Sequence, residues 1–426
     1  MEDIEIYENY FNRKYKVIND ILEYYHSNKK IIAVWGAGLR GNAFLNIFDP
    51  FNEKIGYVFD KDKSRYGEIL KNGHEITDFL KYDADIVIAV NNSLEYSILH
   101  TLRQNGKKAM VLNIDNIILG DLTKDEVLYP KVSSLEKVRE VKIGAVVVVY
   151  HPDDSVVDNI KTYADNLEIV YVHDNSEIKN EVFEKELKKF SNVIYNFPGE
   201  NQGLCVPFNK FYNMAVKQGI DWMITFDQDS AASAGMVEKM RKFVESAECK
   251  DTIGIISPTV NELDYSDIKQ DSLYTYYDVV IQSGAMHRIS MMGQVGSYNE
   301  DLFIDMVDWD YCVRCRAKGY HIIRLNNAVL LHNQSDNNIG KNFINGKMLY
   351  SNKFSPDRYY YICRNALYSY SKYYETDPVY GLVCLNTLKK LKMNLEHDTG
   401  YEIKKKAMEM AEKDFRKGKM GKWTRI

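Results

Sequence analysis

The sequence lacks the features of a membrane-spanning or exported protein. None of its 426 residues lies in an apolar stretch that approaches the ~20 residues a membrane helix requires. The N-terminus shows no basic segment followed by an apolar one, so no signal peptide is predicted. The six cysteines are scattered, at positions 205, 249, 312, 315, 363 and 384. This scatter indicates no disulfide framework, and we expect a cytoplasmic protein.

A general excess of basic residues is also missing. The net charge of −5 argues against a nucleic-acid-binding protein. Residues 389–426 are the exception, since they contain twelve Lys or Arg and six acidic residues. This local excess predicts either a solvated helical face or a surface that contacts anionic lipid at the inner face of the plasma membrane.

The first positive feature is a glycine-rich turn near the N-terminus. A buried strand over Ile31–Trp35 runs into Gly36, Gly38 and Gly41, spaced as GxGxxG, and Asp60 follows the next strand. This order predicts a Rossmann-like doubly wound domain over residues 1–125, in which the glycines approach a diphosphate and Asp60 holds a ribose. The alternative is that the glycines only form a tight turn. No catalytic set accompanies them, so we expect a nucleotide-binding, sugar-binding or structural role.

The rest of the chain divides into three predicted segments. Residues 126–142 are charged and irregular and are interpreted as a linker. Residues 143–335 alternate β-branched runs with helical periodicity, which predicts an α/β domain whose ligands bind at the carboxyl ends of the strands. Residues 336–426 are interpreted as a helical, basic extension.

The most informative stretch is Asp221–Ser230. The apolar residues Trp222–Phe226 predict a buried strand, and it ends in two carboxylates, Asp227 and Asp229. Burying carboxylates is unfavourable unless a cation or hydrogen-bond donors compensate. Carboxylate oxygens are ligands that Mg²⁺ and Mn²⁺ prefer, so the pair is a candidate metal–diphosphate site. Capping of a following turn is the structural alternative.

Other polar residues stand at strand ends or helix starts of the same segment. Tyr150 and Asp174 follow two strands, where a nucleobase would stack on Tyr150 and donate a ring N–H to Asp174. Asp305 and Asp308 precede a helical stretch, and His332 ends a strand. So many polar residues exceed what caps alone require, although each one taken singly is compatible with a structural role.

The order of these motifs resembles family 2 glycosyltransferases with the A-type nucleotide-sugar fold, and most of all bacterial rhamnosyltransferases. The matching pieces are Val147–Pro152, Val172–Ser176, Asn201–Gly203 with Asn209, Phe226–Ser230, Ser283–Gly284, Val295–Glu300, Leu302–Asp305, Asp308, Arg314, Gly319–Tyr320, His332, and Arg358–Tyr360 with Arg364–Asn365. The family's Glu-Asp pair stands here as Val307-Asp308, so the division of labour between Asp305 and Asp308 departs from the family pattern.

The resemblance implies an inverting transfer dependent on Mg²⁺ or Mn²⁺. It assigns the catalytic base to Asp308, with Asp305 as second choice, and the metal to Asp229, Asp227 and His332. The implied donor-binding residues are Tyr150, Asp174, Asn201, Asn209, Asp227 and Arg314. Stacking on an acceptor sugar is a weaker expectation for Trp309 and Tyr360, since core packing explains both equally well.

The resemblance also suggests substrates. L-rhamnose from dTDP-rhamnose is the preferred donor, with UDP-galactofuranose or another UDP-hexose as alternatives. The acceptor would be a glycan or a lipid-linked saccharide in bacterial cell-surface polysaccharide synthesis, as for a capsule or cell envelope, and the sequence allows a homo-oligomer. Two other classes stay open: a non-catalytic carbohydrate-binding scaffold, and a bifunctional chain whose N-terminal domain uses NAD.

Overall fold

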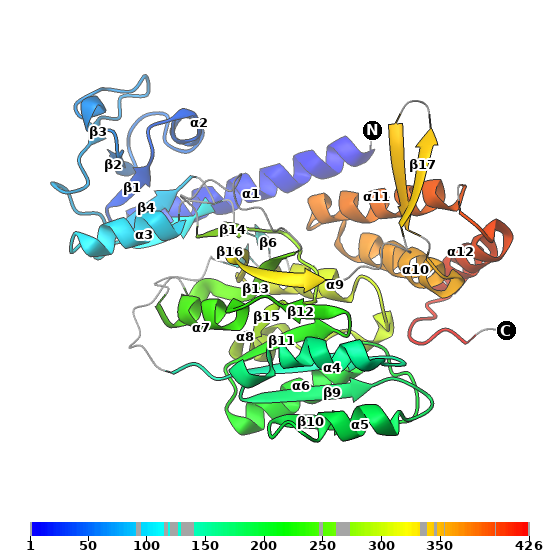
Figure 1. The fold of residues 1–426 in the computed structure, drawn as a ribbon. Helices are drawn as coiled ribbons and strands as arrows, with labels where there is room; N and C mark the ends of the chain where they lie inside the picture. Colours follow the sequence, from blue (N-terminus) through cyan, green and yellow to red (C-terminus); the bar gives the residue numbers. More distant parts are fainter. Residues whose placement is uncertain are drawn as a thin grey trace.

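The protein is a mixed α/β chain with two separate large sheets and a group of C-terminal helices (Figure 1), which confirms the predicted fold class. The computed structural model describes residues 2–90, 95–114, 118–119, 127–128, 140–246, 250–260, 273–332, 339–344, 347–352, 354–396 and 398–424. Among these residues, we find no helix whose length and apolar character suit a membrane span.

The N-terminal sheet has five parallel strands in the order β3-β2-β1-β4-β5, which is a doubly wound order. Its strands are β1 (Ile32–Trp35), β2 (Ile55–Phe59), β3 (Ile76–Thr77), β4 (Ile86–Ala89) and β5 (Met110–Asn113). Its helices are α1 (Glu2–Ser27), α2 (Leu39–Phe48) and α3 (Glu95–Gln104). The buried residues Val17, Ile18, Ile21 and Leu22 of α1 pack on this sheet, and α1 also reaches the C-terminal helices (Figure 1).

The turn between β1 and α2 requires glycine at two positions. Gly36 has φ +105°, and a Cβ added to Gly41 would lie 1.8 Å from the carbonyl oxygen of Gly36. Asp60 Oδ2 accepts a hydrogen bond from the Ala37 backbone N–H at 2.8 Å, and its Oδ1 accepts from Asp62 N–H at 2.9 Å. The Asp60 carboxylate, predicted to bind a ribose, therefore hydrogen-bonds the backbone of the glycine turn. These contacts are explained by the tight-turn interpretation.

The central sheet contains nine strands. Its parallel half has the order β10-β9-β8-β11 and consists of β8 (Ile143–Val149), β9 (Ile169–Asp174), β10 (Val193–Asn196) and β11 (Trp222–Asp227). The sheet continues with β15 (Met286–Arg288), β13 (Ile253–Val260), β16 (His321–His332) and β12 (Ser230–Ala232), and β14 (Tyr274–Tyr276) also pairs with β16. The strand β15 is antiparallel to both of its neighbours, so the sheet is mixed.

Helices cover both faces of the central sheet, as the continuous apolar run of β8 predicts. Alternate residues of β8 face opposite sides, since Val147 belongs to one buried apolar cluster and Val146 to another. The first cluster includes α4 (Asp154–Lys161), α5 (Glu181–Leu187) and α7 (Met236–Ser246). The second includes α6 (Cys205–Gln218), α8 (Ile289–Val295) and α9 (Val307–Ala317).

The C-terminal segment is helical only after its first residues. It begins with an antiparallel hairpin of β17 (Ile339–Ile344) and β18 (Lys347–Asn352), which the prediction of a helical extension did not include. The overlooked signal is Asn345-Gly346 between two β-prone runs, a pattern typical of hairpins. The helices that follow are α10 (Pro356–Tyr373), α11 (Pro378–Leu395) and α12 (Tyr401–Arg416). Ser355 and Asp377 cap α10 and α11, each followed directly by proline.

Most of the predicted linker, residues 126–142, lies outside the described residues. Its described part includes β7 (Val127–Leu128), which pairs with β6 (Ile118–Leu119). The division of the chain into domains therefore stays a prediction.

The glycine turn yields a stability prediction. Gly41→Ala should lower the free energy of unfolding by about 1–3 kcal/mol or more, because its Cβ would collide with the Gly36 carbonyl oxygen. Gly38→Ala is the matched control, since Gly38 has φ −74° and an added Cβ would meet no atom within 4 Å. Denaturant unfolding measures both variants. Equal stability of Gly41→Ala and Gly38→Ala would show that the turn has room for a Cβ at position 41.

Candidate active site

Three of the predicted polar residues, Tyr150, Asp174 and Asp227, lie at the carboxyl ends of three parallel strands. In the sheet register Asp227 pairs with Val148 and Asp174 pairs with Val149, so β11 and β9 end beside the end of β8. The chain runs from β8 to β9 on one side and later returns to β11 on the other. This arrangement is a topological switch point, where open α/β sheets bind their ligands.

The predicted metal ligands Asp227, Asp229 and His332 come together here. One ligand atom from each residue lies within 4.8 Å of the other two. The pairing of β12 with β16 places Ser230 opposite His332, which brings the end of β16 to the carboxylates. His332 Nδ1 lies 3.3 Å from Asp229 Oδ1 and 2.7 Å from Ser230 Oγ.

These three residues fit a divalent cation of the Mg²⁺ or Mn²⁺ type. Asp229 Oδ1 is buried, and within the described residues it accepts no hydrogen bond. Burial, and then the charge of Asp229, raise the pKa of Asp227, so a second carboxylate is held here at an electrostatic cost. A cation would supply the charge that both carboxylates need, and two carboxylates with one imidazole are a suitable ligand set.

Asp308 lies in the first turn of α9 and is connected to this carboxylate pair by Gln282. The Gln282 backbone N–H donates to Asp308 Oδ2 at 3.2 Å, while its side-chain Nε2 donates to Asp227 Oδ1 at 2.7 Å. Burial raises the pKa of Asp308 to about 7, aided by the charges of Asp227 and Asp305 and opposed by the N–H groups of Trp309 and Gln282. A carboxylate with such a pKa is suited to act as a general base near neutral pH.

Asp305 is engaged differently. Arg358 of α10 donates from Nε to Asp305 Oδ2 at 2.7 Å and from a terminal nitrogen to Asp305 Oδ1 at 2.5 Å. Burial raises the pKa of Asp305, while the Arg358 guanidinium opposes this shift. Because this bidentate pair occupies both carboxylate oxygens, the geometry favours Asp308 over Asp305 as the base.

Several predicted donor-binding residues form hydrogen bonds with other residues of the protein. Asp174 has no solvent exposure, and it accepts from Tyr195 Oη at 2.7 Å and from Ser176 Oγ at 2.5 Å. Asn209 bonds both the N–H and the carbonyl of Tyr298. Asn201 Oδ1 accepts from Gly203 N–H at 2.9 Å. Buried polar groups need such partners, so these contacts explain the residues without a donor molecule.

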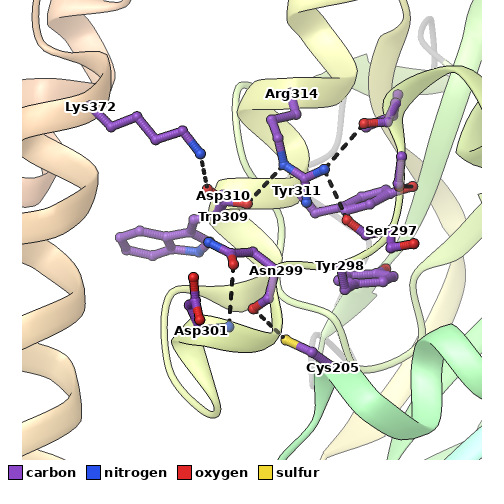
Figure 2. A network of polar contacts seen from close by, with 12 residues as sticks. Cys205, Ser297, Tyr298, Asn299, Asp301, Trp309, Asp310, Tyr311, Arg314 and Lys372 are labelled. Carbon is purple, nitrogen blue, oxygen red and sulfur yellow. Dashed lines mark hydrogen bonds and ion pairs between the residues drawn. The ribbon is translucent and has the colours of Figure 1, made fainter. Parts of the chain in front are cut away.

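Arg314 likewise belongs to a structural network. Figure 2 shows its guanidinium between Asp310 of the same helix and the carbonyl of Ser297, at 2.9 and 3.0 Å. Asp310 is fully buried and also accepts from Tyr373 Oη at 2.6 Å. Arg314 therefore ties α9 to the preceding loop, and Asp310 ties α9 to α10.

The two weak acceptor-binding predictions have a similar outcome. Tyr360 is 2% exposed, stacks on Trp423 at 4.2 Å and donates to Asp414 Oδ2 at 2.9 Å. Its ring has no free face for a sugar, so this burial contradicts the expectation. Trp309 is half-buried, and its indole extends toward the C-terminal helices (Figure 2). It packs there against the buried apolar cluster that contains Tyr373 and Tyr380. Core packing, the alternative interpretation, explains both.

Tyr150 remains at the mouth of the site. Its side chain is 44% exposed, and its backbone N–H donates to Gln228 Oε1 at 2.7 Å, so it lies beside the Asp227–Asp229 turn. A nucleobase can reach this ring.

The sequence interpretation missed two residues of the site. It did not identify Gln282, whose only sequence signal is its position next to Ser283-Gly284, and it assigned no role to Arg358.

Comparisons with known proteins identify the family of the central segment. Residues 154–287 match glycosyl transferase family 2. A relative, dTDP-rhamnosyl transferase RfbF from Shigella flexneri, is 26% identical over 245 residues, which cover 53% of this chain and 78% of the relative. The chain therefore carries a family 2 glycosyltransferase domain, and membership of this domain family makes it a glycosyltransferase. Its sequence is similar to that of a rhamnosyltransferase.

Solved structures also resemble the chain. Mannosyltransferase PcManGT from Pyrobaculum calidifontis, in complex with GDP-Man and Mn²⁺, is 11% identical with a TM-score of 0.42, covering 65% of this chain and 76% of that chain. S. aureus TarS is 14% identical with a TM-score of 0.34, covering 60% of this chain. This chain spans 43% of TarS, less than half of its length. Likenesses of this size carry no argument about substrate.

The buried Asp308 carboxylate predicts a conflict between stability and the role of a base. Because the pKa of Asp308 is about 7 in the folded chain and about 4 when unfolded, the stability contributed by its protonated form is lost as pH rises through about 7. In metal-free buffer, Asp308→Asn should raise the melting temperature at pH 8 and change it little at pH 4.

The same variant should lose transfer by about 10²–10⁴-fold, and the wild-type rate should rise with pH through about 7.

Asp305→Asn is the matched comparison. It breaks the bidentate pair and leaves Arg358 without its carboxylate, so its melting temperature should fall at pH 8. A loss of transfer in Asp305→Asn with full activity in Asp308→Asn would reverse the two roles.

Proposed function

We propose that the protein is an inverting, metal-dependent glycosyltransferase that moves a sugar from a nucleotide donor onto a glycan or lipid-linked saccharide. The observation that carries this proposal is the Gln282 bridge, which joins the carboxylate Asp227 of the metal set to the candidate base Asp308. A leaving diphosphate at the cation and an acceptor hydroxyl at Asp308 would then be neighbours across one sugar ring. In-line displacement requires this relation of the two groups.

The residues divide the reaction between them. Asp308 removes the proton of the acceptor hydroxyl, whose oxygen bonds to the anomeric carbon as the bond to the diphosphate breaks. A divalent cation held by Asp227, Asp229 and His332 would neutralise the departing diphosphate. Gln282 orients Asp227 and Asp308 through its two donors. Tyr150 offers an exposed ring on which a nucleobase stacks.

L-rhamnose from dTDP-rhamnose is the donor we propose first. It is supported by the match to a dTDP-rhamnosyl transferase over 53% of this chain. UDP-galactofuranose and other UDP-hexoses are the alternatives. The wider role that we propose is synthesis of bacterial cell-surface polysaccharide, in which the segment 1–125 serves as a nucleotide-binding, sugar-binding or structural domain.

A donor panel tests this function. The purified chain should release nucleotide from dTDP-rhamnose with Mg²⁺ or Mn²⁺ faster than from UDP-galactofuranose, UDP-glucose or UDP-galactose, and EDTA should abolish the release.

Asp229→Asn should weaken nucleotide binding in the presence of metal, because it removes a charge from the cation site. Asp165→Asn, an exposed acid of the same segment, is the control that should change nothing. Full turnover after chelation would exclude the metal-dependent mechanism.

Membrane contact is a separate proposal. Exposed cations lie on α11 and α12, among them Lys389, Lys390, Lys405 and Lys406, whereas Lys404 is buried and pairs with Asp398 at 2.6 Å. We expect salt-sensitive binding to vesicles containing phosphatidylserine, at about 1 kcal/mol for each engaged Lys. Lys405→Ala with Lys406→Ala should weaken it about tenfold or more. The control pair, Lys185→Ala with Lys217→Ala on α5 and α6, should not. Equal binding to neutral vesicles would contradict the proposal.

A further inference from the structure

The loop that leads to Asp308 has an unusual backbone. This acid loop, residues 300–306, contains three non-glycine residues with positive φ: Phe303 (63°), Asp305 (64°) and Met306 (62°). Phe303 has ψ −63°, and Ile304 N–H donates to the carbonyl of Leu302 at 2.8 Å, which makes a γ-turn of the rare positive-φ form. Each such conformation costs about 1–3 kcal/mol, so surrounding contacts must impose it.

Two adjacent side chains of α10 supply those contacts. Asn365 is fully buried, and its Nδ2 lies near three loop carbonyl oxygens: those of Leu302 (2.9 Å), Ile304 (2.8 Å) and Asp305 (2.9 Å). Arg364 is 1% exposed and donates to the carbonyls of Asp301 at 3.1 Å and Leu302 at 3.3 Å. One amide and one guanidinium therefore satisfy most carbonyls of the acid loop.

The orientation of the Asn365 amide is determined by its neighbour. Arg364 Nε donates to Asn365 Oδ1 at 3.0 Å, which turns the Asn365 NH₂ group toward the loop. On the other side, Leu204 N–H donates to the Phe303 carbonyl at 2.8 Å, and a Cβ added to Gly203 would lie 2.5 Å from that oxygen. The acid loop is thus held between the start of α6 and α10.

The loop's conformation determines where the two acids point. Asp305 lies in it, and Asp308 begins the helix that follows directly. Asn365 hydrogen-bonds the loop backbone and not these carboxylates, so any effect on transfer acts through the loop. We propose that Asn365, supported by Arg364, is a positioning residue that imposes the positive-φ conformation and thereby aims Asp308 at the acceptor hydroxyl. This inference rests on the proposed transferase function.

Asn365→Ala tests the proposal. With the two donor hydrogens removed, the acid loop should relax, and kcat should fall by about 10²-fold, the scale of an ångström-sized misplacement of a catalytic group. The donor KM should change less than about threefold, because Asp227 ends β11, Asp229 lies in the turn to β12 and His332 ends β16, so none of them belongs to the acid loop. Turnover is expressed per nucleotide-binding site, so unfolded molecules do not enter the comparison. Asn365→Ser, which keeps one donor, should lie between wild type and Asn365→Ala.

Ser369→Ala is the matched control, because Ser369 lies one turn further along α10 and is also fully buried. Hydrogen–deuterium exchange of residues 300–310 should rise in Asn365→Ala and stay unchanged in Ser369→Ala. This measurement needs no activity, so it tests the effect of Asn365 on the acid loop even if the wild type is inactive on every donor. Such inactivity would refute only the proposed function. Wild-type kcat in Asn365→Ala, or unchanged exchange of the loop, would overturn the inference.

Discussion

The crowding of carboxylates in one buried site is the constraint on which the rest of this structure depends. Burial raises the pKa of Asp227, Asp305 and Asp308; the charge of Asp229 adds to the rise at Asp227, and the charges of Asp227 and Asp305 add to the rise at Asp308. The positive charge of Arg358 opposes this rise at Asp227. Such a site favours the uptake of a cation and of a proton, and the proposed transfer reaction would use both.

The fold meets this constraint by fixing the acids with contacts from several elements. Asp227 ends a central strand, Asp305 is fixed by an arginine from α10, and Asp308 lies in the first turn of α9, where the helix dipole favours a negative charge. Gln282 then donates to two of these acids at once. Asp305 and Asp308 follow one another along the acid loop and the start of α9, so contacts from α10 and from Gln282 hold them in place.

The sequence allowed the strands and the clustered acids to be predicted because both depend on local pattern. A β-branched run indicates a buried parallel strand, and carboxylates directly after it must lie at the ligand-binding edge. The roles of Asn209 and Arg314 were not predictable in the same way. Each binds carbonyls far along the chain, and a motif does not reveal whether a polar side chain faces a ligand or the protein.

The N-terminal turn shows the same limit. GxGxxG followed by an acid is compatible with a dinucleotide site and with a tight turn that the acid itself closes, and the two differ only in the partner of Asp60. The Asn345-Gly346 hairpin signal, by contrast, was present in the sequence and was overlooked beneath the surrounding basic and aromatic composition. Tertiary contacts explain the first case, and an unrecognised turn explains the second.

The support of the acid loop also bears on where the catalytic unit ends. The family match stops at residue 287, and the predicted catalytic segment stops at 335, yet the loop carbonyls are bound by α10. The chain's last described part takes part as well, since Gly421 N–H donates to the Asp301 carbonyl and Arg364 donates to the Gly421 carbonyl. A chain cut at 335 would expose a strained loop with unpaired carbonyls and leave Asp305 without Arg358. We therefore propose that the catalytic unit extends from the central sheet through α10 to residue 421.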